Sequence, residues 1–296
     1  MQALQNLYRD AGISSLLQQR GHMVLAEREK SIPLLQSQQA RLHEHGIATQ
    51  WLKPDAVAAR APELRQGIAG ALLFTDTGHV SDPWRVCSEL HKAFLAAGGQ
   101  SIRAEVQSAA RGAHGQFDLQ LQPGSVQADK VVLAAGAWSR TLAAQLACDV
   151  PLDTERGYHV TAVDWRGQLD LPIASHERMI IMAPLDCGLR MTGFVEFGGL
   201  LLPPRRQRIE TLRRHLQELM PGAAMSEFSE WMGFRPSLPD HLPVIGGSPA
   251  DQDILFAFGH QHLGLTLAGV TADAVAALAR GDEPALDLHP FRVNRF

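Results

Sequence analysis

The residues best suited to bind a small ligand lie in the C-terminal third of the chain. Arg235 is preceded by Gly233-Phe234 and followed by Pro236 and Pro239. Because proline fixes its own backbone dihedral, this spacing predicts that Arg235 is held in a stiff turn. Its planar guanidinium can form two charge-assisted hydrogen bonds with a carboxylate, so one interpretation is an anchor for a carboxylate ligand. The other is a structural arginine that bonds the carbonyls of the turn.

A glycine-histidine loop follows an apolar strand predicted over residues 254–258. The loop and the start of the next helix run through Gly259-His260-Gln261-His262-Leu263-Gly264-Leu265-Thr266. A helix start presents free N–H groups and a partial positive charge, which suits a negatively charged group. A histidine beside an apolar strand is more often structural, so we assign the backbone rather than either imidazole. Metal binding by the two histidines is not expected, because no third ligand is nearby.

A third segment combines a strand with a glycine turn. Residues 131–135 are continuously apolar, which predicts a strand buried on both faces, and Ala135-Gly136-Ala137-Trp138 follows. Gly136 would let a ligand approach the backbone closely. The alternative is a strand-to-helix turn with ordinary packing.

The elements that position these segments indicate an α/β protein with two lobes. Asp82 and Pro83 predict the start of a helix, and alternating strands follow it. From Pro151 the pattern changes to strands over 158–163, 179–182 and 189–197, which predicts an antiparallel sheet, and then to an amphipathic helix over 209–219. We expect one lobe from residues 80–150 and 233–296, and another from residues 1–79 and 151–232.

Composition narrows the class of protein. The 296 residues are 45% hydrophobic and 20% charged, with a net charge of -4, which argues against a nucleic-acid partner. No stretch approaches the roughly 18 to 20 apolar residues needed to span a bilayer. The three cysteines are far apart, which suggests neither a disulfide framework nor a metal knuckle. A cytoplasmic location is expected, and peripheral contact with the inner face of the membrane stays open.

The runs from Gly233 to Thr266 and from Lys130 to Ser139 resemble the FAD-dependent D-amino-acid oxidase and glycine oxidase superfamily. Within it, the bacterial D-amino-acid dehydrogenases are most similar. The resemblance implies an α/β (α+β two-lobe) fold with a Rossmann-like FAD-binding lobe, residues 80–150 and 233–296, and an antiparallel substrate lobe, residues 1–79 and 151–232. It also implies FAD, bound non-covalently because no cysteine occurs in the final flavin-facing stretch.

The resemblance assigns the candidate site residues as well. Arg235 would anchor the substrate carboxylate, while Tyr158 and His159 would line the pocket near the flavin. Glu196 could bind a substrate amine, but the outward position of an alternating strand is favoured. The residues expected to contact FAD are Val106, Ala135, Gly136, Trp138, Gly259, His260, His262, Leu263, Gly264, Leu265 and Thr266. For Val106 an ordinary packing role is equally plausible.

One part of the family pattern is missing, because no Gly-x-Gly-x-x-Gly motif opens a helix. The run 111–115 lacks the third glycine and lies in a predicted hairpin, so we reject it. By the resemblance, Met1 corresponds to a point downstream of this motif. We expect either an N-terminally truncated gene product or a mis-assigned start, or else a second chain that supplies the missing lobe. Both predict an exposed apolar sheet edge near residues 131–135.

The implied reaction is oxidation of the Cα–N bond of a D-amino acid or a related imino acid. The electron acceptor is open, and a glycine or sarcosine oxidase is an alternative. A further alternative is a non-autonomous fragment or subunit that does not bind FAD alone.

Overall fold

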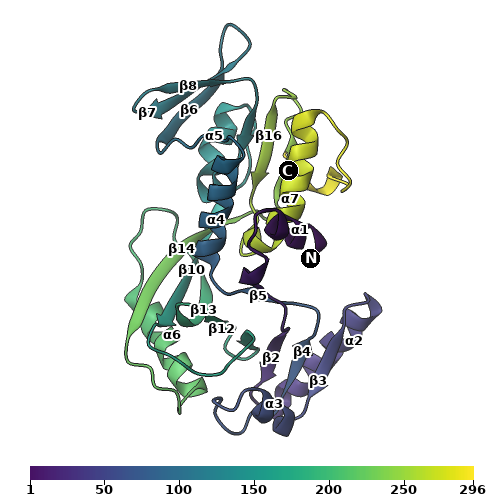
Figure 1. Ribbon diagram of the computed structural model, residues 1–296, viewed down its shortest axis with the longest axis vertical. Helices are drawn as coiled ribbons and strands as arrows, with labels where there is room; N and C mark the ends of the chain where they lie inside the picture. Colours follow the sequence, from purple (N-terminus) through teal and green to yellow (C-terminus); the bar gives the residue numbers. More distant parts are fainter.

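The computed structural model describes residues 1–296, and its two lobes are stacked along the long axis (Figure 1). The lower lobe contains an eight-stranded sheet in the order β14-β10-β13-β12-β11-β2-β4-β3. Its strands are β2 (His22–Ala26), β3 (Thr49–Leu52), β4 (Gly70–Phe74), β10 (Asp153–Ala162), β11 (Ile173–Ser175), β12 (Ile180–Leu185), β13 (Gly188–Phe197) and β14 (Phe228–Ser237). All pairs are antiparallel except β11 with β2.

Helix α6 (Arg206–Leu219) buries one face of this sheet. Its apolar stripe recurs at helical spacing and packs in one core cluster with side chains of β10, β12 and β13. The members of that stripe are Ile209, Leu212, Leu216 and Leu219. At the other end of the sheet, α2 (Ile32–Glu44) and α3 (Pro54–Arg60) pack on β3 and β4. The opposite face of the central strands is therefore left for other contacts.

The upper lobe is built around a smaller sheet in the order β15-β16-β9. Strands β16 and β9 are parallel, with Phe256 opposite Leu133, whereas β15 and β16 are antiparallel. The elements of this lobe are α4 (Pro83–Ala96), β6 (Glu105–Arg111), β7 (Phe117–Gln122), β8 (Ser125–Ala128), β9 (Val131–Leu133), η3 (Gly136–Trp138), α5 (Ser139–Gln145), β15 (Val244–Gly247), β16 (Ile254–Phe258), α7 (Gly264–Arg280) and η4 (His289–Phe291). The predicted mixed α/β class is confirmed.

Strand β9 differs from the prediction that it is buried on both faces. It is the edge strand of its sheet, and Val132 is 46% exposed. A strand buried on both faces needs layers above and below it and neighbours on either side, and β9 has a neighbour on one side only. The apolar sheet edge expected near residues 131–135 is present.

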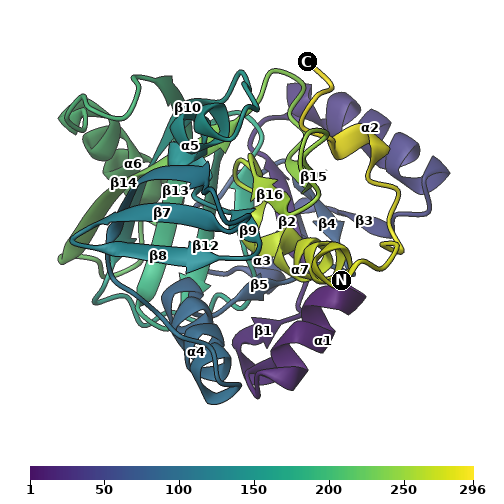
Figure 2. The ribbon, with the colours of Figure 1, turned by 90° about the horizontal axis from the view of Figure 1, so that it is seen from above.

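The N-terminal helix joins the upper lobe rather than the eight-stranded sheet. Helix α1 (Gln2–Asp10) lies beside α7 in both ribbon views (Figures 1 and 2). A Cβ atom built on Gly269 would lie 2.6 Å from the carbonyl carbon of Ala3, so the helices approach too closely for a side chain. The chain reaches the large sheet through η1 (Ser14–Leu16) and β1 (Leu17–Gln18), which pairs with β5 (His79–Val80).

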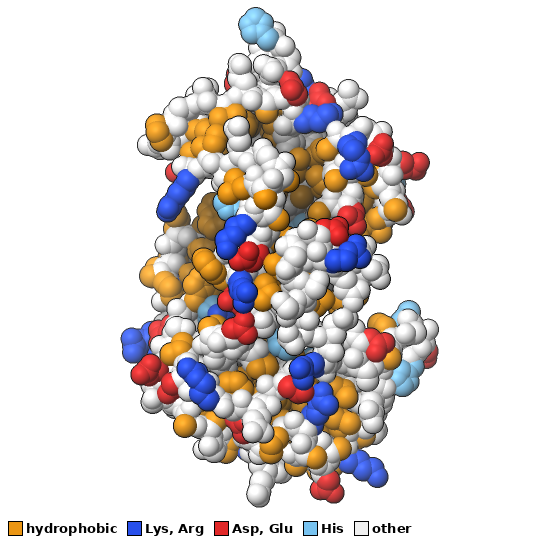
Figure 3. Space-filling view, viewed as in Figure 1, with side chains coloured by type: hydrophobic (Ala, Val, Ile, Leu, Met, Phe, Trp, Pro, Cys, Tyr) orange, Lys and Arg blue, Asp and Glu red, His pale blue; other side chains and the backbone are white.

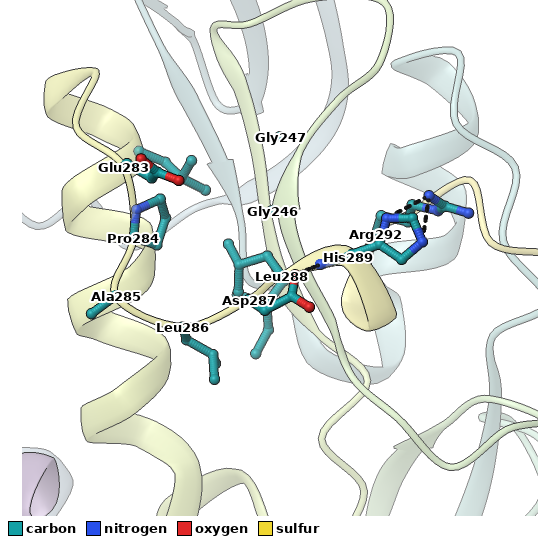
Figure 4. Close-up of a pocket in the computed structure, with 12 residues that line it drawn as sticks. Gly246, Gly247, Glu283, Pro284, Ala285, Leu286, Asp287, Leu288, His289 and Arg292 are labelled. Atoms are coloured by element: carbon teal, nitrogen blue, oxygen red, sulfur yellow. Dashed lines mark hydrogen bonds between the residues drawn. The ribbon is translucent and has the colours of Figure 1, made fainter.

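The surface is of mixed character. Acidic and basic side chains are interspersed over the face seen in Figure 3, with apolar side chains between them. No helix of the protein is both long and apolar enough to cross a membrane. A cavity of about 620 Å³ lies between α7, β15 and the C-terminal residues 283–292 (Figure 4), and none of the predicted site residues lines it.

Candidate functional site

A cavity of about 730 Å³ lies on the face of the large sheet that α6 does not cover. Its size falls in the usual range for small-molecule sites, about 300–1,000 Å³. The cross-strand register aligns a row of side chains on this face: Val24, Ala174, Ile181 and Thr192. The full lining is Val24, Gln38, Glu155, Ala174, Ser175, His176, Arg178, Met179, Ile180, Ile181, Thr192, Gly193, Phe194, Val195, Arg235 and His262.

Arg235 lines this cavity from a strand, not from a turn as the sequence predicted. It lies in β14, opposite Glu155 of β10. Pro236 is tolerated there because β14 is an edge strand, where a missing N–H need not break the ladder. The guanidinium lies over Gly157, where a Cβ atom would come within 2.2 Å of Nη2. The absence of a side chain at Gly157 therefore makes room for the arginine.

The charge of Arg235 has no bonded counter-ion. Its Nη1 donates a hydrogen bond of 2.9 Å to the backbone carbonyl of Phe194, and no carboxylate lies within 4.0 Å of the guanidinium. Burial lowers the pKa of Arg235, and the charge of Glu155 opposes that shift. Phe194 has a φ of 66°, a left-handed conformation that costs free energy for a non-glycine residue. This unusual backbone places the carbonyl that orients Arg235.

The start of α7 is tied to the strand that carries Arg235. The backbone N–H of Gln261 donates to the carbonyl of Pro236 at 3.0 Å, and His262 lines the cavity together with Arg235. No side chain caps the helix, so its first N–H groups are free to bind a ligand. Gly259 turns the chain with a φ of 84°, and a Cβ atom there would lie 2.6 Å from Leu238.

The two loop histidines have different surroundings. Nε2 of His260 contacts Thr271 Oγ1 at 3.0 Å, and burial lowers the pKa of the imidazole. His260 therefore packs against the body of α7, whereas His262 lines the cavity. Leu263, the residue before the helix, is 41% exposed. Gly264, Leu265 and Thr266 form the first turn of α7.

The glycine turn after β9 lies beside the same strand. Trp138 packs edge-on against Phe234, with ring centroids 5.7 Å apart, and remains 58% exposed. Gly136 has a φ of 56°, and a Cβ atom on it would meet no heavy atom within 4 Å. Ala135, which precedes it, is half-buried. This turn is open on its outer side.

Val106 lies apart from these segments. It belongs to β6, the edge strand of the separate sheet β6-β7-β8, and is 38% exposed. It does not line the cavity with Arg235.

His159 lies on the cavity face of the sheet but outside the lining of the cavity. It pairs with Thr192 on one side and Trp231 on the other, and its ring stacks on Trp231 with centroids 5.1 Å apart. Burial, together with the charge of Arg190, lowers the pKa of His159 to about 4. The imidazole is therefore neutral near pH 7.

Tyr158 does not line the pocket, and this part of the prediction is wrong. Strand alternation turns it toward α6, where it is fully buried in the core. Its hydroxyl donates to Glu196 at 2.6 Å and accepts from the backbone N–H of Arg205 at 3.1 Å. Glu196 is only 6% exposed and pairs with Arg205, so the outward position favoured for it is also wrong. A buried carboxylate is stable there because both partners bind it.

Sequence reasoning missed several residues that line the cavity, above all Glu155. Its position could have been found, because Glu155 lies four residues before His159 in one alternating strand and so shares its face. Arg178 and His176 were harder to find, because they follow the short strand β11 in an irregular turn.

The turn at Gly136 and the start of α7 follow two neighbouring parallel strands, so they meet at the same edge of the sheet. The turn has Gly136 in a left-handed backbone conformation with open space beside it, and the helix α7 starts without a side-chain cap. Both features fit the close approach of a dinucleotide and the negative charge of a reduced flavin. Beside them, the cavity offers a cation for a carboxylate. The arrangement can therefore hold a small acid next to a flavin.

The comparisons with known proteins agree with this description. The model of the family DAO, described as FAD dependent oxidoreductase, matches residues 1–278. A D-amino-acid oxidase of Bradyrhizobium diazoefficiens is 33% identical over 85% of this chain and 61% of its own length. A D-amino acid dehydrogenase of Neisseria meningitidis serogroup C is 25% identical over 94% of this chain and 68% of its own length. The chain thus spans about three fifths of the first relative and two thirds of the second.

Among solved structures, the glycine oxidase of Geobacillus kaustophilus superposes with a TM-score of 0.87. The match covers 99% of this chain and 79% of that one, with 24% sequence identity. At this identity the likeness shows the fold alone. The predicted resemblance is confirmed.

Proposed function

Because the chain belongs to the DAO family of FAD dependent oxidoreductases, we propose that it oxidises the Cα–N bond of a D-amino acid or related imino acid. The observation that carries this proposal is Arg235, a half-buried cation that faces a cavity and has no carboxylate partner. A charge that is partly withdrawn from water costs free energy unless it is paired, so a carboxylate ligand is the natural occupant. The similarity to a D-amino-acid oxidase supports the choice of substrate.

The residues of this chain bind and orient the substrate in the proposed reaction. Arg235 holds the carboxylate, and the carbonyl of Phe194 keeps the guanidinium in place. The sheet row from Val24 to Thr192 forms the floor beneath the substrate. Holding the reacting carbon in one orientation can contribute several kcal/mol to catalysis.

The cofactor would be held by the turn at Gly136 and the start of α7. FAD, when bound, supplies the acceptor for the hydride that leaves the substrate Cα. The free N–H groups of Gly264, Leu265 and Thr266 would stabilise negative charge at that end of the site. His159 remains neutral and stacked on Trp231, so it shapes the sheet face without adding charge.

A glycine or sarcosine oxidase is a second candidate for the activity. The superposition on a glycine oxidase favours it at the level of the fold. It differs from the first candidate in the substrate side chain and leaves the role of Arg235 unchanged. A panel of D-alanine, glycine and sarcosine separates the two candidates.

We also propose, as an alternative, that the chain works with a further polypeptide segment. The open edge of β9 supports this, because an exposed apolar edge strand is a template for pairing with another strand. Binding of FAD only in the presence of such a segment would favour it. Stoichiometric FAD binding by the purified chain would contradict it.

Substitution of Arg235 tests the central role. The dissociation constant of D-alanine is measured by anaerobic calorimetry on the FAD-supplemented chain after reduction with dithionite, which prevents turnover, for the wild type and for Arg235→Ala. We expect the variant to bind at least about tenfold more weakly, because a charge-assisted hydrogen bond contributes about 1.5–3 kcal/mol. Arg206→Ala is the matched control, because Arg206 is exposed and pairs within α6. Equal affinity in wild type and Arg235→Ala would remove Arg235 from the anchor role.

A further inference from the structure

The cavity that contains Arg235 also contains an acidic side chain that nothing in the fold binds. Glu155 is the only carboxylate among the residues that line it. It makes no ion pair within 4.0 Å and no side-chain hydrogen bond. Other acidic groups in this part of the lobe are bonded: Glu27 to Arg178, and Glu196 to Tyr158 and Arg205. An unbonded carboxylate in a cavity is a candidate ligand for a cation.

Glu155 and Arg235 face the same space. They are direct partners across the antiparallel pair of β10 and β14, so their side chains leave the sheet on the same face. The guanidinium turns along the sheet to lie over Gly157 and to bond Phe194, instead of closing on Glu155. The opposite charges act on each other through space, since Glu155 raises the pKa of Arg235 against the effect of burial. The two side chains nevertheless form no ion pair within 4.0 Å.

The other charges around the cavity are already neutralised. Arg178 donates to both carboxylate oxygens of Glu27, at 2.7 and 3.0 Å, and also pairs with Glu218. The other ionisable side chains of the lining are the imidazoles of His176 and His262. Among the arginine and glutamate side chains of the lining, the unpaired charges are one cation, Arg235, and one anion, Glu155.

We infer that Glu155 binds the ammonium group of the substrate while Arg235 binds its carboxylate. The two residues form a zwitterion clamp, defined here as the pair Glu155 and Arg235. This inference rests on the proposed function and extends it, because it assigns a second specificity residue and a substrate class. The clamp selects α-amino acids with a basic nitrogen over 2-hydroxy acids of the same shape. It also fixes the substrate at two points, which orients the Cα–N bond.

The contributions of Glu155 and Arg235 can be measured separately with two ligands of similar shape. D-alanine carries an ammonium where D-lactate carries a hydroxyl group, and both carry the carboxylate. Their dissociation constants are measured by anaerobic calorimetry on the FAD-supplemented full chain after reduction with dithionite, which prevents turnover, for wild type, Glu155→Gln and Arg235→Lys. Glu230→Gln is the matched control, because Glu230 also lies on this strand pair but bonds Arg213 outside the cavity.

We expect Glu155→Gln to weaken D-alanine binding about tenfold or more and to leave D-lactate binding equal or tighter. Arg235→Lys weakens both ligands, and Glu230→Gln changes neither. Unchanged D-alanine binding in Glu155→Gln overturns the inference and leaves the carboxylate anchor intact. Equal weakening of both ligands also overturns it, because Glu155 then acts only by positioning Arg235. A wild-type chain that binds neither ligand overturns the proposed function itself.

Discussion

Arg235 shows what residue types can and cannot reveal. The sequence identified it as a carboxylate-binding candidate, and the structure adds a cavity, a missing counter-ion and the support of Phe194. Its setting in a strand was not predictable from Pro236 and Pro239, because an edge strand accepts proline as readily as a turn does. Tyr158 was misplaced for a different reason. The family pattern names the residue, but only strand register decides the face that it occupies.

The lowered pKa of His159 predicts how the stability of the protein depends on pH. Because the fold lowers its pKa from 6.5 to about 4, the unfolded chain binds more protons between these values. The contribution of neutral His159 to stability is therefore fully present above pH 6.5 and is lost as the pH falls toward 4. The free energy of unfolding, measured with urea, should fall less between pH 7 and pH 5 in His159→Phe than in the wild type. This variant keeps a ring on Trp231. An identical loss in wild type and variant would contradict the assignment.

Glu27 makes a prediction about stability. It is 6% exposed and receives hydrogen bonds from Arg178, Ser175 and Arg65. Burial alone would raise its pKa, but these bonds lower the pKa to about 2. Without the Glu27 carboxylate, Arg178 would keep only the exposed Glu218 and Arg65 would have no carboxylate partner, and removing one partner of a buried pair costs about 3–5 kcal/mol.

Urea unfolding at pH 7 should therefore show a loss of this size in Glu27→Gln. Glu210→Gln is the control, because Glu210 pairs with Arg206 on the surface of α6 and contributes about 0.5 kcal/mol or less. Similar losses in the two variants would show that the Glu27 network is not structurally important.

At the scale of elements, the chain was most predictable where periodicity is strong. The helix that starts at Pro83 is capped by Asp82, whose side chain accepts hydrogen bonds from two backbone N–H groups. The antiparallel strands after Pro151 and the amphipathic α6 are present as predicted. Strand β9 was harder to predict, because continuous apolarity says which residues avoid water but not which neighbours cover them.

Gly157 lies where β10 pairs with β14, and a substitution there tests the position of Arg235. A methyl group at this position would overlap the end of the Arg235 side chain, which is flexible and can move away. We expect Gly157→Ala to weaken D-alanine binding about tenfold while changing the free energy of unfolding by less than about 1 kcal/mol. Gly222→Ala is the control, because a Cβ atom there meets no neighbour. Unaltered binding in Gly157→Ala would show that the position of Arg235 over Gly157 is unimportant.

For the whole molecule, the open edge of β9 is the feature with the largest consequence. The sequence predicted it from the absence of a nucleotide-binding fingerprint, and the structure shows Val132 exposed on an edge strand that pairs only with β16. Exposed apolar edge strands promote association between chains, and a lysine blocks such pairing. Val132→Lys should therefore reduce concentration-dependent self-association in analytical ultracentrifugation.

Leu34→Lys serves as the control for this measurement. Leu34 is 53% exposed, but it lies on helix α2 and not on the edge of a sheet. The Leu34→Lys variant should therefore self-associate like the wild type. If both variants reduce association equally, general apolarity rather than the edge of β9 is responsible.

The central claim is that this chain oxidises an amino acid held by Arg235 with the help of bound FAD. The most direct measurement is the anaerobic visible absorption spectrum of the purified chain, titrated with FAD and then with D-alanine. We predict a flavin band at about 450 nm that remains with the protein after gel filtration and bleaches on addition of D-alanine. A chain that retains FAD but whose band is unchanged by D-amino acids, glycine and sarcosine would contradict the proposed function. A chain that never retains FAD would contradict the cofactor site built from Gly136 and the start of α7.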